Sequence, residues 1–206
     1  MLAVKPLSAF AVLDRCFSTA ALPFYHHPGE VLPSGDEDNH NIIVLRKGVV
    51  RVWRPQREVL LGILPAPLII GLPGLVLDSR EPYQLQAMLS CEGYQLQASK
   101  AMLLLDQHHL WRDAFHWLTW QYRMLENRDA QLVGQSSYSQ IRASLLTLES
   151  WESSLRSRIG VLSYIQQRTR ISRSVIAEVL AALRMGRYIE MDKGKLIAVH
   201  RLPLEY

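Results

Sequence analysis

The chain has 206 residues, a hydrophobic content of 49%, a mean hydropathy of zero and a formal net charge of +4. This length is sufficient for two small domains with buried cores, and no stretch reaches the roughly 20 consecutive apolar residues that a membrane helix needs. Cys16 and Cys91 are too few and too far apart for a disulfide framework or a cysteine-ligated cluster, and the apolar start of the chain does not read as a leader peptide, so a reducing cytoplasm is expected.

Residues 24–98 have the pattern of a β-rich domain. Short runs of β-prone residues are separated by turn residues such as Lys47-Gly48 and Pro73-Gly74. The runs are Ile42–Leu45, Val49–Trp53, Val59–Leu64, Tyr83–Leu89 and Cys91–Ala98. Around Leu85, apolar residues alternate with Gln84 and Gln86, which predicts that the glutamines face outward. The whole pattern predicts an antiparallel barrel or sandwich.

Between Leu110 and Val133 the pattern changes to that of one long helix without Pro or Gly. Its apolar residues recur at alternating spacings of four and three, which is typical of a coiled-coil seam. The predicted seam consists of Trp111, Phe115, Leu118, Tyr122, Leu125, Asp129 and Leu132, and all of these except Asp129 are the expected dimer-interface residues. Trp117 and Trp120 widen the apolar surface, so we expect the barrel to cover one side and a second copy of the helix to cover the seam. The alternative is a monomeric helix buried in its own domain.

The segment 134–137 predicts a hinge, and a further helix is expected over Tyr138–Leu148. Residues 162–183 then predict two short helices joined by a tight basic turn, a helix-turn-helix. Ser172 is expected to cap the second helix with its hydroxyl group. Helical spacing predicts that one face of this helix is buried and the opposite face exposed. The buried set is Val175, Ile176, Val179, Leu180 and Leu183, and the exposed set is Arg173, Ser174, Ala177, Glu178 and Ala181. An ordinary helical hairpin within a core is the alternative.

Two β-prone runs flank Asp192-Lys193-Gly194-Lys195 and predict a hairpin wing. Positive charge gathers in the same part of the chain, because residues 151–206 hold ten Lys and Arg against five Asp and Glu, while residues 1–150 hold thirteen against fourteen. Such a local excess is expected where a protein neutralises phosphates. A solvated basic surface is the alternative.

In this order, the barrel, long helix, hinge and winged helix-turn-helix resemble the Crp/Fnr superfamily of bacterial transcription regulators over residues 28–201. The strand, Lys-Gly turn and strand of residues 45–52 are similar to that superfamily, and residues 70–75 are similar to its phosphate cassette. Residues 172–176 are similar to the start of its recognition helix, and residues 194–196 to its wing. Residues 164–169 and 202–204 are most similar to a small enterobacterial branch named for repressing peroxide resistance.

The resemblance also indicates effectors that this chain is not built to bind. Cyclic-nucleotide-binding members have a cassette carboxylate for the ribose hydroxyl and, a few residues later, an arginine for the cyclic phosphate. Leu72 stands at the carboxylate position, and Pro73 removes a backbone N–H beside it. Glu81 falls near the arginine position, with Arg80 close but offset. We therefore expect no cyclic nucleotide, no iron–sulfur cluster and no other cofactor.

The sequence offers little support for an enzyme or a metal site. His26 and His27 would point to opposite faces of a strand, so they do not form the histidine pair of a barrel metal site. His109, Asp113 and His116 could share a helix face, but a solvated helix surface is the simpler interpretation. Cys91 is conceivable as a thiol switch, although a lone cysteine in a strand is more often a small core residue.

We therefore predict an α+β fold in three parts. Residues 1–109 form an antiparallel β-barrel of the cyclic-nucleotide-binding jelly-roll type, residues 110–134 form the dimerisation helix and hinge, and residues 135–206 form a winged helix-turn-helix domain. The predicted function is that of a cytoplasmic, homodimeric, sequence-specific DNA-binding regulator of transcription. Its expected partners are double-stranded DNA, a second copy and, as a further candidate, RNA polymerase, and no membrane is expected. The alternative is an interaction module whose winged domain binds a protein.

The expected DNA contacts fall into two groups. Arg173, Ser174 and Glu178 face the base edges, because arginine can bond to guanine and glutamate can accept from cytosine. Phosphate contacts are expected from Arg168, Arg170, Lys193 and Lys195. Thr169 and Ser172 complete the predicted contact surface.

Overall fold

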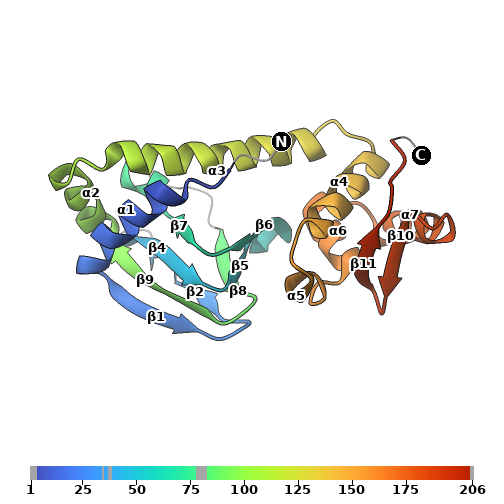
Figure 1. Ribbon diagram of the computed structural model, residues 1–206, viewed down its shortest axis with the longest axis horizontal. Helices are drawn as coiled ribbons and strands as arrows, with labels where there is room; N and C mark the ends of the chain where they lie inside the picture. Colours follow the sequence, from blue (N-terminus) through green and yellow to red (C-terminus); the bar gives the residue numbers. More distant parts are fainter. Residues whose placement is uncertain (1–3, 34, 37–38, 78–82, 205–206) are drawn as a thin grey trace. The chain divides into compact units, whose positions relative to one another are not determined.

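The computed structural model describes residues 4–33, 35–36, 39–77 and 83–204. The chain separates into two compact units, residues 1–57 with 61–126 and residues 58–60 with 127–206 (Figure 1). The three-part division expected from the sequence stays a prediction.

The first unit is built on two antiparallel sheets. One has the order β1-β9-β4-β3, with β7 also paired to β4, and the other has the order β2-β8-β5-β6. The strands of the first sheet are β1 (Leu22–His26), β3 (Gly35–Asp36), β4 (Asn39–Lys47), β7 (Leu68–Ile70) and β9 (Cys91–Gln97). Those of the second are β2 (Val31–Leu32), β5 (Val49–Arg54), β6 (Val59–Pro65) and β8 (Gln84–Ala87). All five predicted strand runs are confirmed.

Strand alternation determines which side chains enter the core between the sheets. In β8, Leu85 and Ala87 are buried and pair with Val52 and Val50 of β5. Gln84 is exposed, as the alternating pattern predicts. Short 3-10 helices, η1 (Ser18–Ala20), η2 (Pro55–Arg57) and η3 (Leu72–Leu75), connect the elements of this unit.

Three helices lie along one side of these sheets, namely α1 (Leu7–Phe17), α2 (Ala98–Gln107) and α3 (Trp111–Leu132) (Figure 1). The long helix α3 is confirmed, whereas α1 and α2 were not expected from the sequence. On α1, Phe10, Leu13 and Phe17 are buried in the core. Trp117 of α3 is fully buried, and its indole Nε1 donates a hydrogen bond of 2.8 Å to the Ile69 carbonyl of β7. These contacts make the helices part of the barrel core.

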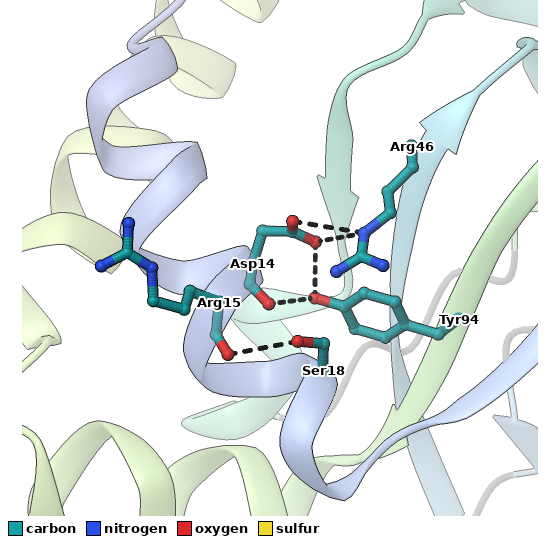
Figure 2. Close-up of polar contacts among 5 residues, drawn as sticks. All are labelled: Asp14, Arg15, Ser18, Arg46 and Tyr94. Carbon is teal, nitrogen blue, oxygen red and sulfur yellow. Dashed lines mark hydrogen bonds and ion pairs between the residues drawn. The ribbon is translucent and has the colours of Figure 1, made fainter.

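A polar network attaches α1 to the sheet (Figure 2). The Arg46 Nε donates to the Asp14 carboxylate at 2.9 Å, and the Tyr94 hydroxyl donates to the same carboxylate at 2.9 Å and to the Asp14 carbonyl at 3.0 Å. The Arg46 guanidinium also lies 4.9 Å from the centre of the Tyr94 ring. Burial, followed by the hydrogen bond to Asp14, raises the pKa of Tyr94 well above its usual value. Tyr94 therefore keeps its proton, and its hydroxyl group holds α1 in place by donating hydrogen bonds to Asp14.

The second unit contains the last turns of α3 and a compact helical domain with a two-stranded hairpin. Its further elements are α4 (Ser137–Glu149), α5 (Ser153–Arg156), α6 (Val161–Thr169), α7 (Arg173–Met185), β10 (Ile189–Asp192) and β11 (Lys195–Val199). Ser136 caps α4 by accepting a bond from the Ser139 N–H. Fully buried residues of three helices, Ile141, Ile165 and Ile176, contribute to the core of this domain. Within the described residues, we find no helix with the length and apolar character required to cross a membrane.

Candidate nucleic-acid interface

The turn between α6 and α7 is held by local hydrogen bonds. The Thr169 hydroxyl donates to the Ile165 carbonyl at 2.7 Å and accepts from the Ile171 N–H at 3.2 Å. Arg170, the next residue, has a left-handed backbone with φ of 66°, which ends α6 and leaves its side chain exposed. The Thr169 side chain thus stabilises the turn, and the Arg170 side chain is accessible to solvent.

Helix α7 starts with the predicted cap. The Ser172 hydroxyl accepts a hydrogen bond of 3.4 Å from the Val175 N–H and lies 3.1 Å from the Ser174 hydroxyl. The N-terminal end of a helix carries partial positive charge, which favours a nearby phosphate. Ser172 and Ser174 are both exposed at this end.

The two faces of α7 agree with the sequence prediction except at one residue. Ile176, Val179, Leu180 and Leu183 are buried, whereas Val175 is 37% exposed and was wrongly expected in the buried set. Val175 lies in the first turn, where fewer side chains cover the helix. All five residues of the predicted exposed set are exposed.

Two members of the exposed face are suited to reading bases. Arg173 and Glu178 are charged and exposed on α7. The Arg173 Nη1 donates to the Gln166 Oε1 of α6 at 3.4 Å, so the side chain leans along the first helix of the motif. Arg173 and Glu178 are five residues apart on a small, polar surface, and they supply the donor and the acceptor that hydrogen bonds to base edges use.

The wing is an antiparallel hairpin in which Asp192 pairs with Lys195. Lys193 and Gly194 both have positive φ, 44° and 78°, as a tight two-residue hairpin turn requires. Lys193 is exposed at the tip, whereas Lys195 is half-buried and donates through Nζ to the Arg158 carbonyl at 2.9 Å. The hairpin prediction is confirmed.

Arg158, a basic residue that was not among the predicted DNA contacts, lies beside the wing. The Val161 N–H donates to the Gly194 carbonyl at 3.0 Å, so the start of α6 lies against the wing tip. Arg158, just before α6, is exposed there. Its place in the basic C-terminal segment was visible in the sequence, but its proximity to the wing depends on tertiary contacts.

Arg168 lies elsewhere than a phosphate contact would require. Only 8% of the residue is exposed, and its guanidinium donates to the Tyr164 hydroxyl and the Gln131 side-chain oxygen. The expectation of a phosphate contact is therefore corrected, because the first helix of the motif turns this arginine inward.

The expected dimer residues divide into two groups. Trp111, Phe115, Tyr122 and Leu125 are exposed along one side of α3, with Phe115 at 68%. Leu118 is partly buried against the barrel core, and Leu132 is 9% exposed within the second unit. The described chain thus leaves an apolar stripe on α3, which we call the α3 stripe: Trp111, Phe115, Tyr122 and Leu125.

The segment that is similar to a phosphate cassette is closed by apolar packing. Gly71 has φ of 101° and precedes η3, and Leu72 is 1% exposed within the barrel core. The position at which the resemblance implies a carboxylate therefore points into the core. Arg80 and Glu81 lie outside the described residues.

Neither thiol is activated by its surroundings. Cys91 is fully buried, and burial raises the pKa of the Cys91 thiol. Burial also raises the pKa of the Cys16 thiol on α1. Since the thiolate is the reactive form, both shifts lower reactivity. Across residues 4–33, 35–36, 39–77 and 83–204, no cluster of three or more His, Cys, Asp or Glu has the placement needed to bind a metal ion.

Comparison with protein families supports the identity of the C-terminal domain. Residues 137–204 match a family model described as winged helix-turn-helix DNA binding. Among solved structures, the c-di-GMP-responsive global regulator CLP of Xanthomonas campestris superposes with a TM-score of 0.72 at 17% identity, covering 93% of this chain and all of that one. A protein of Eubacterium rectale assigned to the Crp/Fnr family of transcriptional regulators superposes with a TM-score of 0.71 at 14% identity, covering 95% and 94% of the two chains. The fold is therefore that of Crp/Fnr regulators.

Full-length relatives show the family. The Escherichia coli protein named inhibitor of hydrogen peroxide resistance is 52% identical over 204 residues, which is 98% of both chains. The Salmonella typhimurium protein of the same name is 50% identical over 203 residues, again 98% of both chains. This chain, with its Crp/Fnr fold and winged helix-turn-helix domain, belongs to the family of the inhibitor of hydrogen peroxide resistance.

Proposed function

We propose that this protein is a sequence-specific, double-stranded-DNA-binding regulator of transcription that lowers the resistance of the cell to hydrogen peroxide. The observation that carries this proposal is the N-terminal half of α7, which is capped by Ser172 and exposes Arg173, Ser174 and Glu178 beside a basic wing. The names of its relatives support the physiological role.

In this proposal α7 enters the major groove from its N-terminal end. Arg173 bonds to a guanine edge, Glu178 accepts from a cytosine amino group, and Ser174 tolerates several bases. Arg170, Lys193 and Lys195 contact phosphates, with Lys195 first releasing its bond to the Arg158 carbonyl. Arg158 is added to this group because it is exposed next to the wing.

The active form is a homodimer that pairs through the α3 stripe. An exposed row of large apolar side chains on a long helix is costly in water and favours a twin helix as its cover. A dimer also presents two reading helices to two half-sites. A regulator of this kind acts in the cytoplasm, where RNA polymerase is its further candidate partner.

We propose that neither a cyclic nucleotide nor an iron–sulfur cluster is the effector, and that the protein has no catalytic activity. Leu72 fills the cassette from the core side, and two cysteines are too few to hold an iron–sulfur cluster. The barrel then serves as a scaffold for α3.

A matched pair of variants tests the DNA-binding roles. A preferred duplex is first selected by the wild-type protein from a random library. Arg173→Ala should lose about 1–3 kcal/mol of binding free energy on that duplex and relax the preference at one base pair. Lys193→Ala should weaken binding to selected and random duplexes alike and lower the salt slope by roughly one unit.

Arg173→Ala must change the sequence preference and Lys193→Ala must not, if Arg173 reads a base and Lys193 contacts a phosphate. If both reduce affinity for selected and random duplexes by the same factor across a salt series, α7 does not read sequence. Deletion of the gene should also raise cell survival in hydrogen peroxide, and restoring the Arg173→Ala form should not reverse that survival.

A second candidate function rests on a groove between α7 and the wing. Met185 is 81% exposed and Ile197 is 49% exposed, and they line this groove together with Arg184, Glu190 and Asp192. Exposed apolar side chains in a groove favour a protein partner over DNA. In this alternative, cells that carry Ile197→Lys would survive hydrogen peroxide as well as cells that lack the gene. DNA binding by the purified variant would be unchanged.

A further inference from the structure

Arg168 forms a buried polar cluster that connects two helices of the second unit. Its Nη1 donates to the Tyr164 hydroxyl at 3.3 Å, and its Nη2 donates to the Gln131 Oε1 at 2.5 Å. The Arg168 carbonyl accepts from the Arg128 Nη2 at 3.4 Å. Arg128 and Gln131 belong to the last turns of α3, whereas Tyr164 and Arg168 belong to α6. We call Arg168, Tyr164 and Gln131 the Arg168 clamp.

The charge of Arg168 is poorly compensated for a buried group. Among the described residues, the ion pairs do not include Arg168, although the neighbouring Arg170 pairs with Glu58, and the Arg168 Nε has no hydrogen-bond partner. Burying a cation in this way costs several kcal/mol before its hydrogen bonds offset any of that cost. Apolar residues of similar volume at such sites are often neutral or stabilising. Net stability is therefore a weak explanation for an arginine at this position.

The geometry of the bonds provides a better explanation. Arg168 lies in the last turn of α6, directly before the Thr169–Ser172 turn that leads into α7. Gln131 lies one residue before the end of α3. Directional bonds from a planar guanidinium fix the orientation between two helices more narrowly than apolar contacts do. A small rotation of α6 about α3 would break the bond to Gln131 and leave the charge without its shortest contact.

We infer that Arg168 is a positioning residue for DNA recognition, which holds α6, and with it the start of α7, at a fixed orientation to the end of α3. This inference rests on the proposed function, because it assumes that α7 reads sequence. It adds that the reading geometry depends on a buried side chain that never touches DNA. Within the second unit, α6 and the last turns of α3 then move as one body.

The test compares two neighbouring arginines in the full-length protein. Arg168→Met keeps an apolar stem of similar length and removes the guanidinium group. We expect it to fold with a melting temperature equal to or above that of the wild type, and to lose roughly tenfold to hundredfold in affinity for the selected duplex. Affinity for random duplexes and the salt slope should be unchanged. Arg170→Met, the exposed control, should weaken binding to both duplexes and flatten the salt slope.

Changes at Gln131 test the same contact from α3. Gln131→Leu removes the acceptor and should lower the preference for the selected duplex as Arg168→Met does. Gln131→Glu keeps an acceptor, adds a compensating charge and should retain that preference. If Arg168→Met does not fold, the two Gln131 variants still test whether the clamp positions α7, because neither change alters α6.

Three outcomes would overturn the inference. If Arg168→Met flattens the salt slope as Arg170→Met does, Arg168 contacts phosphate. If Arg168→Met or Gln131→Leu retains the full preference for the selected duplex, the clamp does not position α7 and only this inference fails. A wild-type protein with no preference among duplexes would instead overturn the proposed function, and the clamp's role in recognition with it.

Discussion

In the first unit, the Asp14 carboxylate accepts hydrogen bonds from the buried Tyr94 and from the exposed Arg46, which hold α1 on the barrel. In the second unit, by contrast, Arg173, Ser174 and Glu178 stand exposed on α7 with few internal partners. The difference lies in where each unit places its polar groups. A polar group satisfied inside the protein contributes to rigidity, and one left in water at a capped helix end is free to bind. In the proposed function, the barrel serves as a support and the winged domain as the part that reads DNA sequence.

Arg168 and Arg170 repeat this contrast within two residues of the same helix end. Arg168 points into the protein, where its charge meets Tyr164 and Gln131. Arg170 is exposed and forms an ion pair of 3.6 Å between its Nη1 and the Glu58 Oε2. Both were expected to contact phosphate, because composition and spacing do not distinguish the two sides of so short a segment. The position of a charge on the helix, and not its presence in the sequence, decides its role.

The largest expected effect concerns the apolar face of the barrel unit. Leu125 is 59% exposed on the α3 stripe, and Leu125→Glu would place an unpaired charge in the proposed dimer interface. A buried uncompensated charge costs about 3–5 kcal/mol, which corresponds to a loss of more than roughly hundredfold in dimer affinity. Light scattering at micromolar concentration should show a dimer for the wild type and a monomer for Leu125→Glu.

His116→Glu provides the matched control for this change. His116 is exposed on α3 but lies outside the stripe, so its variant should remain dimeric. A monomeric wild type would mean that the α3 stripe does not form a dimer interface. The proposal that the barrel unit supports DNA reading by pairing two copies would then fail.

The sequence predicts this fold well wherever periodicity is strong. The strand alternation around Leu85, the long helix, the Ser172 cap and the hairpin at Lys193-Gly194 were all identifiable from local spacing and turn chemistry. By contrast, α1 is not among the elements that the sequence pattern predicts. Its spacing of Phe10, Leu13 and Phe17 is nevertheless helical.

The candidate site was less predictable because it depends on tertiary contacts. The sequence placed Leu118 on the dimer seam, but the barrel core covers part of it. The contact between Lys195 and the Arg158 carbonyl joins residues 37 positions apart, and no local pattern reveals it. Local spacing identifies which face a residue occupies, whereas the partner of that face is determined by the rest of the fold.

The next effect tests whether the barrel network is internal. The pKa of Tyr94 is raised by burial and by its bond to Asp14, so above pH of about 10 the unfolded chain loses this proton while the folded chain retains it. The unfolded state then binds fewer protons, and the free energy of unfolding falls by about 1.4 kcal/mol per pH unit for each such group. Urea unfolding of the wild type should show this decline at alkaline pH.

Tyr94→Phe isolates the contribution of this residue. It should be less stable than the wild type at neutral pH, because the bonds to Asp14 are lost, but its stability should fall less steeply above pH of about 10. Tyr25→Phe, which alters a 53% exposed tyrosine outside this network, is the matched substitution and should leave stability at neutral pH unchanged. Equal slopes in the wild type and Tyr94→Phe would show that the hydroxyl titrates freely, and the barrel network would then not be an internal support.

The smallest expected effect concerns Ser172 at the start of α7, in the winged domain. Ser172 caps α7 through a long bond of 3.4 Å to the Val175 N–H, so Ser172→Ala should cost about 1 kcal/mol of unfolding free energy. Ser172→Asp keeps a cap acceptor and should preserve stability, but its carboxylate would repel a nearby phosphate and weaken binding to every duplex. Chemical denaturation and duplex titration of both variants separate the two properties. If Ser172→Asp bound DNA as tightly as the wild type, the start of α7 would lie away from the phosphates, and the exposed polar face of the winged domain would have to serve another partner.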